Sequence, residues 1–381
     1  MKLNLIIFVC LMIACTEQVT PPESVRLDLT VTVIDTFGYT RFATDTTLVD
    51  SAAVMVNSLT YQTAFSAQTD SNGQTCLEQM LPDKYTFSAT KRIPVEIVEG
   101  VLGFPLELAL NGHAPNIEID ADHNEIDLYM VPVLIGQLLI SEIYYSGAPP
   151  NPAFYFHDQF IELYNNSGST FYLDSLIIAD VSYGHIDEDY IHAVHAYMFP
   201  GSGADYPLGP GQFVIVAQDA INHLDKNPNS IDLSGADFEY YVKGKGDVDN
   251  PDTPNMIQLH HKYGIDFLYS VMNNAIVLVK VDDPYQYGYD QFNELLIPKT
   301  AIMDGVEYKE DLNEVDLKRL DITIDAGLAG GFAPYTGRSI ERVIADTKDG
   351  RAVLMDNNNS SFDFQVLDKP TIGYLWDAGG E

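Results

Sequence analysis

The sequence predicts an all-β protein. Hydrophobic residues make up 46% and charged residues 20% of its 381 residues, so the chain can bury a large core and is not intrinsically disordered. In residues 27–33, apolar and polar side chains alternate with the period of two that is typical of a half-buried strand. Similar short segments recur along the chain with turns between them, and no long segment shows the helical period.

Residues 1–14 are predicted to be a signal peptide. Residues 3–13 are apolar except for one Asn, and this run is shorter than the about 20 residues that a membrane-spanning helix needs. Ala14 immediately before Cys15 resembles the lipobox of bacterial lipoproteins, which implies cleavage before Cys15 and acylation of that residue. The alternative is an ordinary signal peptide with an incidental Cys. Residues 15–24 are then a tether.

Acidic residues dominate the charge. The chain has 55 acidic and 20 basic side chains, a net charge of -35. Nucleic acid is therefore excluded as a partner, because its phosphates need basic residues to neutralise them. A polybasic membrane contact is excluded for the same reason, so the lipid on Cys15 is the expected membrane attachment.

Cysteine use excludes an internal disulfide. Cys10 leaves with the signal peptide and Cys15 is acylated, so Cys76 is the one remaining thiol. Cys76 lies in a predicted strand, which favours a buried, inert thiol over a nucleophile.

Residues 25–133 are predicted to form the first domain. Strands are expected at residues 27–33, 52–56, 65–68, 75–77, 81–89 and 125–131. A turn and the strand after it carry the residues Thr69, Asp70, Gly73, Leu81, Pro82, Lys84 and Tyr85. This pattern resembles the transthyretin-like carboxypeptidase regulatory domain, with Asp83 in place of the usual Gly. The resemblance implies a β-sandwich without catalytic residues, in which Asp70 forms a turn.

Residues 134–381 are predicted to form the second domain. Its recognisable segments are residues 138–145, 158–166, 171–178, 208–217, 337–343 and 356–364. In this order they resemble the lamin-tail domain, with Gln159 where Glu is common and Ile340 where Leu is common. The resemblance implies an Ig-like sandwich with a long insertion at about residues 218–303. The expected fold class is thus two consecutive β-sandwich domains, first transthyretin-like and then Ig-like lamin-tail.

The order of these parts indicates a location. A lipobox followed by the two domains resembles cell-envelope lipoproteins of Bacteroidota. Thr16 rather than Asp follows Cys15, which in the Gram-negative sorting pattern implies the outer membrane. Glu17 is the one acidic residue directly after the lipid site, so the periplasmic and the surface-facing leaflets both stay open.

The sequence contains no established catalytic motif. A zinc helix of the His-Glu-x-x-His type, a Gly-x-Ser-x-Gly elbow and a phosphate loop are all absent. The best metal-ligand candidates are His185, Asp187, His192 and His195. His192 and His195 would share a face if this stretch formed a helical turn. Carboxylates lie near any His in so acidic a chain, so a solvated loop is preferred to a metal site.

No cofactor is predicted, and calcium stays open as an alternative. Acidic clusters occur at Asp120, Asp122 and Asn124, and at Asp247, Asp249 and Asp252. Neither cluster has the Gly at position six and the Glu at position twelve of an EF-hand loop. A less regular calcium loop is the remaining alternative.

Residues 144–157 combine three prolines with five aromatic rings. Rigid aromatic side chains provide contact area at a low entropic cost, which is typical of protein interfaces. The candidate partner-binding residues are Tyr144, Tyr145, Phe154, Tyr155 and Phe156. The alternative is that these rings plug the end of the sandwich.

These observations favour a non-enzymatic, lipid-anchored envelope protein that acts as a binding or accessory module. We expect its partner to be a protein of the outer membrane or envelope. One alternative is a metal-dependent hydrolase that uses the histidines of residues 185–195. Another is a structural subunit of a larger outer-membrane assembly such as an importer.

Overall fold

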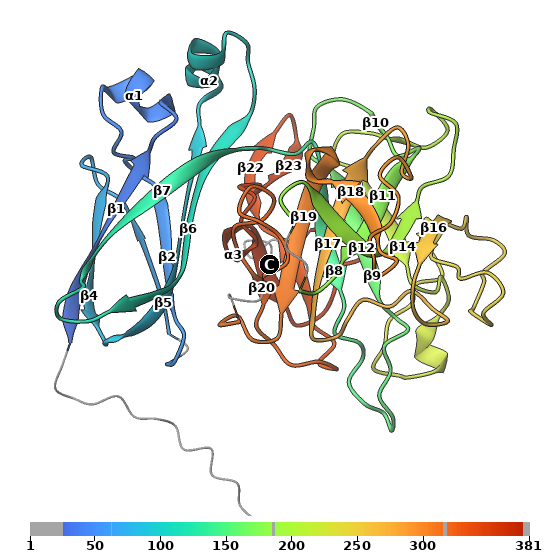
Figure 1. Ribbon diagram of the computed structural model, residues 1–381. Coiled ribbons are helices and arrows are strands. Elements are labelled where there is room, and N and C mark those ends of the chain that lie inside the picture. Colours follow the sequence, from blue (N-terminus) through green and yellow to red (C-terminus); the bar gives the residue numbers. More distant parts are fainter. Residues whose placement is uncertain (1–25, 62, 185–186, 315–317, 376–381) are drawn as a thin grey trace, which may run out of the picture.

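The computed structural model describes residues 26–375, apart from residues 62, 185–186 and 315–317. The described chain is mostly β-strand, which confirms the predicted all-β class. Figure 1 shows two groups of strands side by side, a first unit of residues 27–134 and a second unit of residues 138–375. The predicted lipid site Cys15 lies outside the described residues. Among the described helices, none has the length and apolar character needed to span a membrane.

The first unit is a single curled sheet. Within residues 26–61 and 63–134, seven strands pair in the order β3-β2-β5-β6-β7-β1-β4. Their bounds are β1 (Leu27–Asp35), β2 (Ala53–Ser58), β3 (Ala64–Gln68), β4 (Gln74–Met80), β5 (Asp83–Ile93), β6 (Leu108–Ile119) and β7 (Glu125–Leu134), with helices α1 (Tyr39–Thr44) and α2 (Val95–Leu102) above one end. The edge strands β3 and β4 are joined by the short turn of residues 69–73. The sheet must therefore curl until its edges meet at this turn, and its apolar face encloses the core.

The connecting turn forms as its sequence predicts. Asp70 Oδ1 accepts hydrogen bonds from the N–H groups of Asn72 at 2.8 Å and Gln74 at 3.0 Å, and these bonds lower the pKa of Asp70. Cys76 lies in β4 as predicted, but its thiol is exposed, so the prediction of a buried thiol is wrong. Its neighbour Leu77 takes the buried position, because successive side chains of a strand point to opposite faces.

The second unit is a sandwich of two larger sheets. In the described part of this unit, one sheet has the order β15-β14-β9-β8-β21-β24, and the other has the order β16-β12-β11-β17-β19-β20 with β18 paired to β12. The first of these sheets contains β8 (Leu138–Tyr144), β9 (Phe160–Asn165), β14 (Phe213–Ala217), β15 (Phe238–Glu239), β21 (Ser339–Arg342) and β24 (Phe364–Leu367). The second contains β11 (Leu176–Val181), β12 (Tyr190–Met198), β16 (Ile257–His261), β17 (Asn273–Lys280), β18 (Leu295–Pro298), β19 (Ile302–Lys309) and β20 (Ala329–Gly330). Smaller elements are β10 (Phe171–Tyr172), β13 (Pro207–Leu208), η1 (His223–Asp225), η2 (Lys299–Ala301), β22 (Ile344–Lys348), β23 (Arg351–Leu354) and α3 (Ser360–Asp363).

One hydrophobic core lies between these two sheets. Ile140 and Ile161 from one sheet pack in the same cluster as Ile178 and Leu278 from the other, and all four are fully buried. Residues 218–303, predicted as an insertion, supply β15 to one sheet and β16, β17 and β18 to the other. Because β17 lies in the middle of its sheet, this segment is an integral part of the sandwich and not a peripheral insertion.

Arg342 at the end of β21 is buried among three carboxylates. Its Nη2 donates to Asp304 at 2.7 Å, and its Nη1 lies 3.3 Å from Asp356 and 3.5 Å from Asp363. Its Nε donates to the carbonyl of Ile140 at 2.8 Å. Burial raises the pKa of Asp304 and of Asp363, while Arg342 opposes that rise. The guanidinium thereby fixes β8, β19 and the segment of residues 355–363 around β21.

The segment held by Arg342 also contacts the first unit. Arg92 of β5 donates to the carbonyl of Asp356 at 3.2 Å. The buried Asn111 of β6 donates to the carbonyl of Asn358 at 3.1 Å and also to that of Asn357. These bonds run from side chains of the first unit to the main chain of the second, and they join the two units at a polar contact.

Three buried glutamates form a row across neighbouring strands of the second unit. Glu142 of β8 lies opposite Glu162 of β9 and opposite Glu341 of β21, and all three are fully buried. Ser339 donates to Glu142 at 2.5 Å, and the N–H of Gly373 donates to Glu162 at 2.7 Å. Burial raises the pKa of Glu142 and of Glu162 to about 8. Both carboxyl groups therefore hold a proton at neutral pH, which removes the repulsion between facing charges.

Substitution of Glu142 by Gln should weaken the pH dependence of stability. The pKa of Glu142 rises from 4.5 to about 8 on folding, so its contribution is complete below about pH 4.5 and is lost as the pH rises through about 8. One such group gives a slope of at most about 1.4 kcal/mol per pH unit. Urea unfolding of wild type and Glu142→Gln between about pH 5 and pH 9 should show the shallower slope in the variant. Parallel slopes would contradict the raised pKa.

Candidate functional site

The candidate site lies at one end of the second unit, where β9 begins and β14 ends. These strands are antiparallel neighbours, with Phe160 opposite Ala217. The residues just before β9 and just after β14 must therefore meet, and the N–H of Gln218 donates to the carbonyl of Gln159 at 2.8 Å. This pairing places His157 and Asp219 at the same end of the sandwich.

Gln159 brings a third segment to this end. Its Nε2 donates to the carbonyls of Tyr145 at 2.6 Å and Tyr269 at 2.7 Å, and its Oε1 accepts the N–H of Tyr269 at 2.8 Å. Phe267 and Tyr269 are buried in the core, so the residue before them, Asp266, is held against the sheet. A Glu at position 159 has no N–H to donate to the two carbonyls. An amide at this position therefore satisfies three main-chain groups that a carboxylate could not satisfy together.

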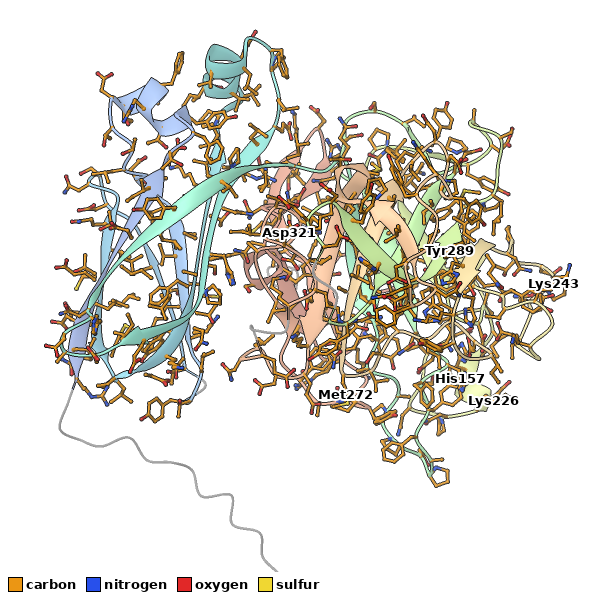
Figure 2. All side chains as sticks on the ribbon, in the orientation of Figure 1. His157, Lys226, Lys243, Met272, Tyr289 and Asp321 are labelled. Atoms are coloured by element: carbon orange, nitrogen blue, oxygen red, sulfur yellow. The ribbon has the colours of Figure 1, made fainter. Side chains whose placement is uncertain are left out.

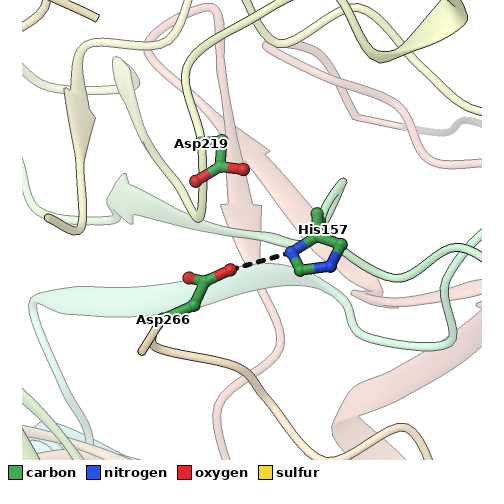
Figure 3. A group of neighbouring side chains, drawn as sticks. All are labelled: His157, Asp219 and Asp266. Atoms are coloured by element: carbon green, nitrogen blue, oxygen red, sulfur yellow. Dashed lines mark hydrogen bonds and ion pairs between the residues drawn. The ribbon is translucent and has the colours of Figure 1, made fainter. Parts of the chain in front are cut away.

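His157, Asp219 and Asp266 come together at this point, as Figure 3 shows. Nδ1 of His157 lies 2.8 Å from Oδ2 of Asp266, and Nε2 of Gln218 donates to the same oxygen at 2.6 Å. One possible ligand atom from each member of the trio lies within 4.8 Å of the others. Asp219 and Asp266 are buried, whereas the His157 side chain is 41% exposed. Solvent therefore reaches the group from the side of His157, which Figure 2 labels in the second unit.

Several buried oxygens in this group have no hydrogen-bond donor within the part of the chain that the structure describes. They are Oδ1 of Asp219, Oδ1 of Asp266 and Oε1 of Gln218. Burial, with the charges of Asp266 and Asp247, raises the pKa of Asp219 to about 8, and the bond to Asp266 raises the pKa of His157. Buried polar atoms are normally paired in folded proteins, so this concentration of unpaired acceptors is unusual.

Two of the predicted partner-binding residues are core residues. Tyr145 is fully buried, and its ring stacks on Tyr308 with centroids 3.7 Å apart and on Phe332 at 5.2 Å. Tyr144 is buried against Phe160 at 5.9 Å. The prediction that Tyr144 and Tyr145 bind a partner is corrected accordingly, because neither ring is accessible. For these two rings the alternative interpretation holds, since they fill the interior of the sandwich.

Phe154, Tyr155 and Phe156 lie outside the core. Phe154 is 65% exposed and contacts the ring of Tyr335, with centroids 4.5 Å apart. Phe156 is partly buried and lies 6.2 Å from the same ring. The hydroxyl of Tyr155 forms a hydrogen bond with Nδ1 of His223 at 2.7 Å. These three residues stay the predicted partner-binding set.

Hydrogen bonds from two sides hold this loop. The N–H of Tyr335 donates to the carbonyl of Ser146 at 2.6 Å, and the N–H of Gly337 donates to that of Gly147 at 3.0 Å. From the other side, Nδ2 of Asn227 donates to the carbonyl of Pro149 at 3.0 Å. The loop is thus fixed to its surroundings although its tip is exposed.

The predicted metal ligands of residues 185–195 are only partly brought together. His185 lies outside the described residues. Asp187 and His192 do meet, with Oδ2 and Nε2 3.4 Å apart. His195 does not join them, because its Nδ1 contacts Asp180 at 3.0 Å. The stretch forms strand β12, with a bulge in its pairing to β11, and not the helical turn considered from the sequence.

His192 belongs instead to a group with Asp290 and Glu294. Its Nδ1 lies 2.9 Å from Asp290, which also accepts the N–H groups of Phe292 and Glu294 at 2.8 Å each. Lys262 donates to Glu294 at 2.8 Å. Backbone donors and a positive charge therefore already compensate the carboxylates of this group.

The two acidic stretches considered for calcium form ordinary turns. Asp120 accepts the N–H groups of Asp122 at 2.8 Å and His123 at 2.9 Å. Asp247 accepts the N–H groups of Val242 at 2.7 Å and Val248 at 2.9 Å. These backbone bonds are typical of turns formed by Asp, and the calcium alternative stays a prediction.

Comparison with known proteins matches part of the chain to a family. Residues 209–371 match the DUF4876 family, described as "Protein of unknown function". A DUF4876 family protein from Bacteroides thetaiotaomicron VPI-5482 has a similar crystal structure, with a TM-score of 0.57, 22% identity, and coverage of 93% of this chain and 98% of that chain. This similarity shows a shared fold. No curated protein matches the chain. The transthyretin-like and lamin-tail resemblances stay predictions.

The DUF4876 segment contains Asp219 and Asp266, whereas His157 precedes it. The sequence analysis named none of the three as site residues. Pairing the predicted strands of residues 158–166 and 208–217 would have placed His157 beside Asp219. No sequence pattern locates Asp266, which lies between strands in the segment predicted as an insertion.

Substitution of Gln159 by Glu should destabilise the second unit. The carbonyls of Tyr145 and Tyr269 would lose their donor and face a buried charge, a cost of about 3 kcal/mol. Gln212→Glu is the matched control, because the exposed Gln212 only accepts the N–H of Gly209, which a carboxylate also accepts. Urea unfolding should show a lower midpoint for Gln159→Glu alone. Equal midpoints for both variants would argue against the role of Gln159.

Proposed function

We propose that this protein is a non-enzymatic, lipid-anchored protein of the outer membrane that binds an envelope protein through the Phe154 loop, residues 146–157. The observation that carries the proposal is the 65% exposed ring of Phe154 on a loop held by hydrogen bonds from two sides. An exposed aromatic ring on a fixed loop contributes binding energy without a large ordering cost.

The position of the clefts supports a binding role over catalysis. Enzyme sites are usually concave pockets that contain the reactive groups. In the described structure, clefts of about 690 Å³ and 610 Å³ lie at the junction of the two units, lined by residues such as Asn57, Glu310, Arg92 and Arg351. Neither lining includes His157, Asp219 or Asp266. The hydrolase alternative has less support, because His192 and His195 contact different carboxylates, Asp290 and Asp180.

The apolar run that ends at Ala14-Cys15 supports the lipid anchor. Cys15→Ser should move the protein from the membrane fraction to the soluble fraction, since acyl chains contribute about 0.8 kcal/mol per buried CH₂. Palmitate labelling followed by cell fractionation measures both effects. Cys76→Ser is the control and should keep label and location. Unchanged labelling of Cys15→Ser would rule out this anchor.

Truncation of Phe154 should weaken partner binding and leave the fold intact. The partner is first identified by a photo-crosslinking amino acid at position 154, with position 104 as the reference. Phe154→Ala should then lower the affinity for the purified partner about 30-fold, the loss of a hot-spot residue worth about 2 kcal/mol. Phe104→Ala removes a ring that is 54% exposed on the first unit and should have no effect.

The conclusion that Phe154 contributes to binding requires that Phe154→Ala and Phe104→Ala have equal thermal midpoints. If Phe154→Ala binds as tightly as Phe104→Ala, the interface lies elsewhere on the protein. If crosslinks form from position 104 and none from position 154, the Phe154 loop is not the contact surface.

A further inference from the structure

We propose that His157, Asp219 and Asp266, assisted by Oε1 of Gln218, form a binding site for one divalent transition-metal cation of the zinc type. The site shares His157 with the end of the Phe154 loop, but metal binding is tested on the protein without a partner, so the two proposals can fail separately. Its support is the chemistry of the donor atoms, their lack of hydrogen-bond donors and the acidity of the trio.

The donor atoms suit zinc. Imidazole nitrogen and carboxylate oxygen are both zinc ligands, whereas calcium and magnesium sites use oxygen alone. A tetrahedral zinc site holds its ligand atoms about 3.4 Å apart. The three atoms here lie within 4.8 Å of one another, so shifts of about an ångström would close the site. His157 can move this far because its side chain is 41% exposed.

The unpaired oxygens point to a missing ligand. Asp219 is 2% exposed, and its Oδ1 has no hydrogen-bond donor among the described residues. Figure 3 shows this carboxylate directed toward the pair of His157 and Asp266. Oδ1 of Asp266 and Oε1 of Gln218 are also buried without a donor. One cation satisfies several such acceptors at once, whereas one water molecule has only two hydrogens to donate.

The acidity of the trio supports the same conclusion. Two buried carboxylates, Asp219 and Asp266, lie together with one partly exposed imidazole, that of His157. Buried charges in proteins are paired or bind metal ions. A divalent cation between the two carboxylates would pair both of them. The group of His192, Asp290 and Glu294 differs, because Lys262 and backbone N–H groups already pair with its carboxylates.

Zinc titration of the purified full chain, first stripped with a chelator, tests the site. We expect one Zn²⁺ per chain and a higher thermal midpoint in its presence. Asp219→Asn should lower the Zn²⁺ affinity at least about 100-fold, because it replaces an anionic ligand by a neutral amide. Asp290→Asn is the matched control, a partly buried carboxylate next to a His in the other group, and it should bind Zn²⁺ like wild type.

Misfolding of the variant is distinguished by its behaviour without metal. Asp219→Asn removes a carboxylate that other carboxylates repel, so its metal-free midpoint should equal or exceed that of wild type. A second probe is Co²⁺, whose visible absorption should appear with wild type and be absent with His157→Gln.

Three results would overturn the proposal. The first is no stoichiometric Zn²⁺ binding by wild type. The second is equal Zn²⁺ affinity of wild type, Asp219→Asn and His157→Gln. The third is tight binding of Ca²⁺ that Zn²⁺ does not displace, since this would indicate a site built from oxygen atoms alone.

Discussion

The buried ion group around Arg342 is the interaction on which the assembly of the protein depends. The guanidinium lies between β8, β19 and residues 355–363, and it forms a hydrogen bond with each of these three parts of the chain. Removal of one partner of a buried pair costs about 3–5 kcal/mol, because the remaining charge is uncompensated. The same segment carries the carbonyls that Arg92 and Asn111 contact, so the junction between the two units follows from the geometry at Arg342.

Buried carboxylates recur throughout the second unit, and their charge is neutralised in different ways. At Arg342 a single cation and backbone donors stabilise three aspartates. In the row of Glu142, Glu162 and Glu341, burial raises the pKa of the first two to about 8, so both hold protons at neutral pH. Burial likewise raises the pKa of Asp219 to about 8, but its Oδ1 has no hydrogen-bond donor among the described residues. The high acidity of this chain is therefore partly an internal property of its sandwich and not only a property of its surface.

The sequence predicted the strands and turns that local patterns determine. It did not predict the features that depend on contacts between residues far apart in the chain. The period-two segment at residues 27–33 is β1, and the turn at Asp70 forms as expected, because both are set by neighbouring residues. Strand β6 was not predicted, since Gly112 and Pro115 interrupt its pattern and only its pairing with β5 and β7 stabilises it. Tyr144 and Phe154 are both aromatic residues of the proline-rich stretch 144–157, yet Tyr144 is buried and Phe154 is exposed. The position of Asp266 depends on a contact between Gln159 and Tyr269 that spans more than a hundred residues of sequence, and no local pattern encodes it.

The junction between the units joins side chains of each unit to main-chain carbonyls of the other. Arg92 and Asn111 of the first unit donate to carbonyls of residues 356–358, and Asn358 of the second unit donates to the carbonyl of Leu134. Every amino acid possesses the accepting carbonyl, so at these bonds the sequence constraint falls on the three donor side chains. In evolution either unit could change the residues that only accept, but an exchange of units between relatives would keep these bonds only where all three donors are kept.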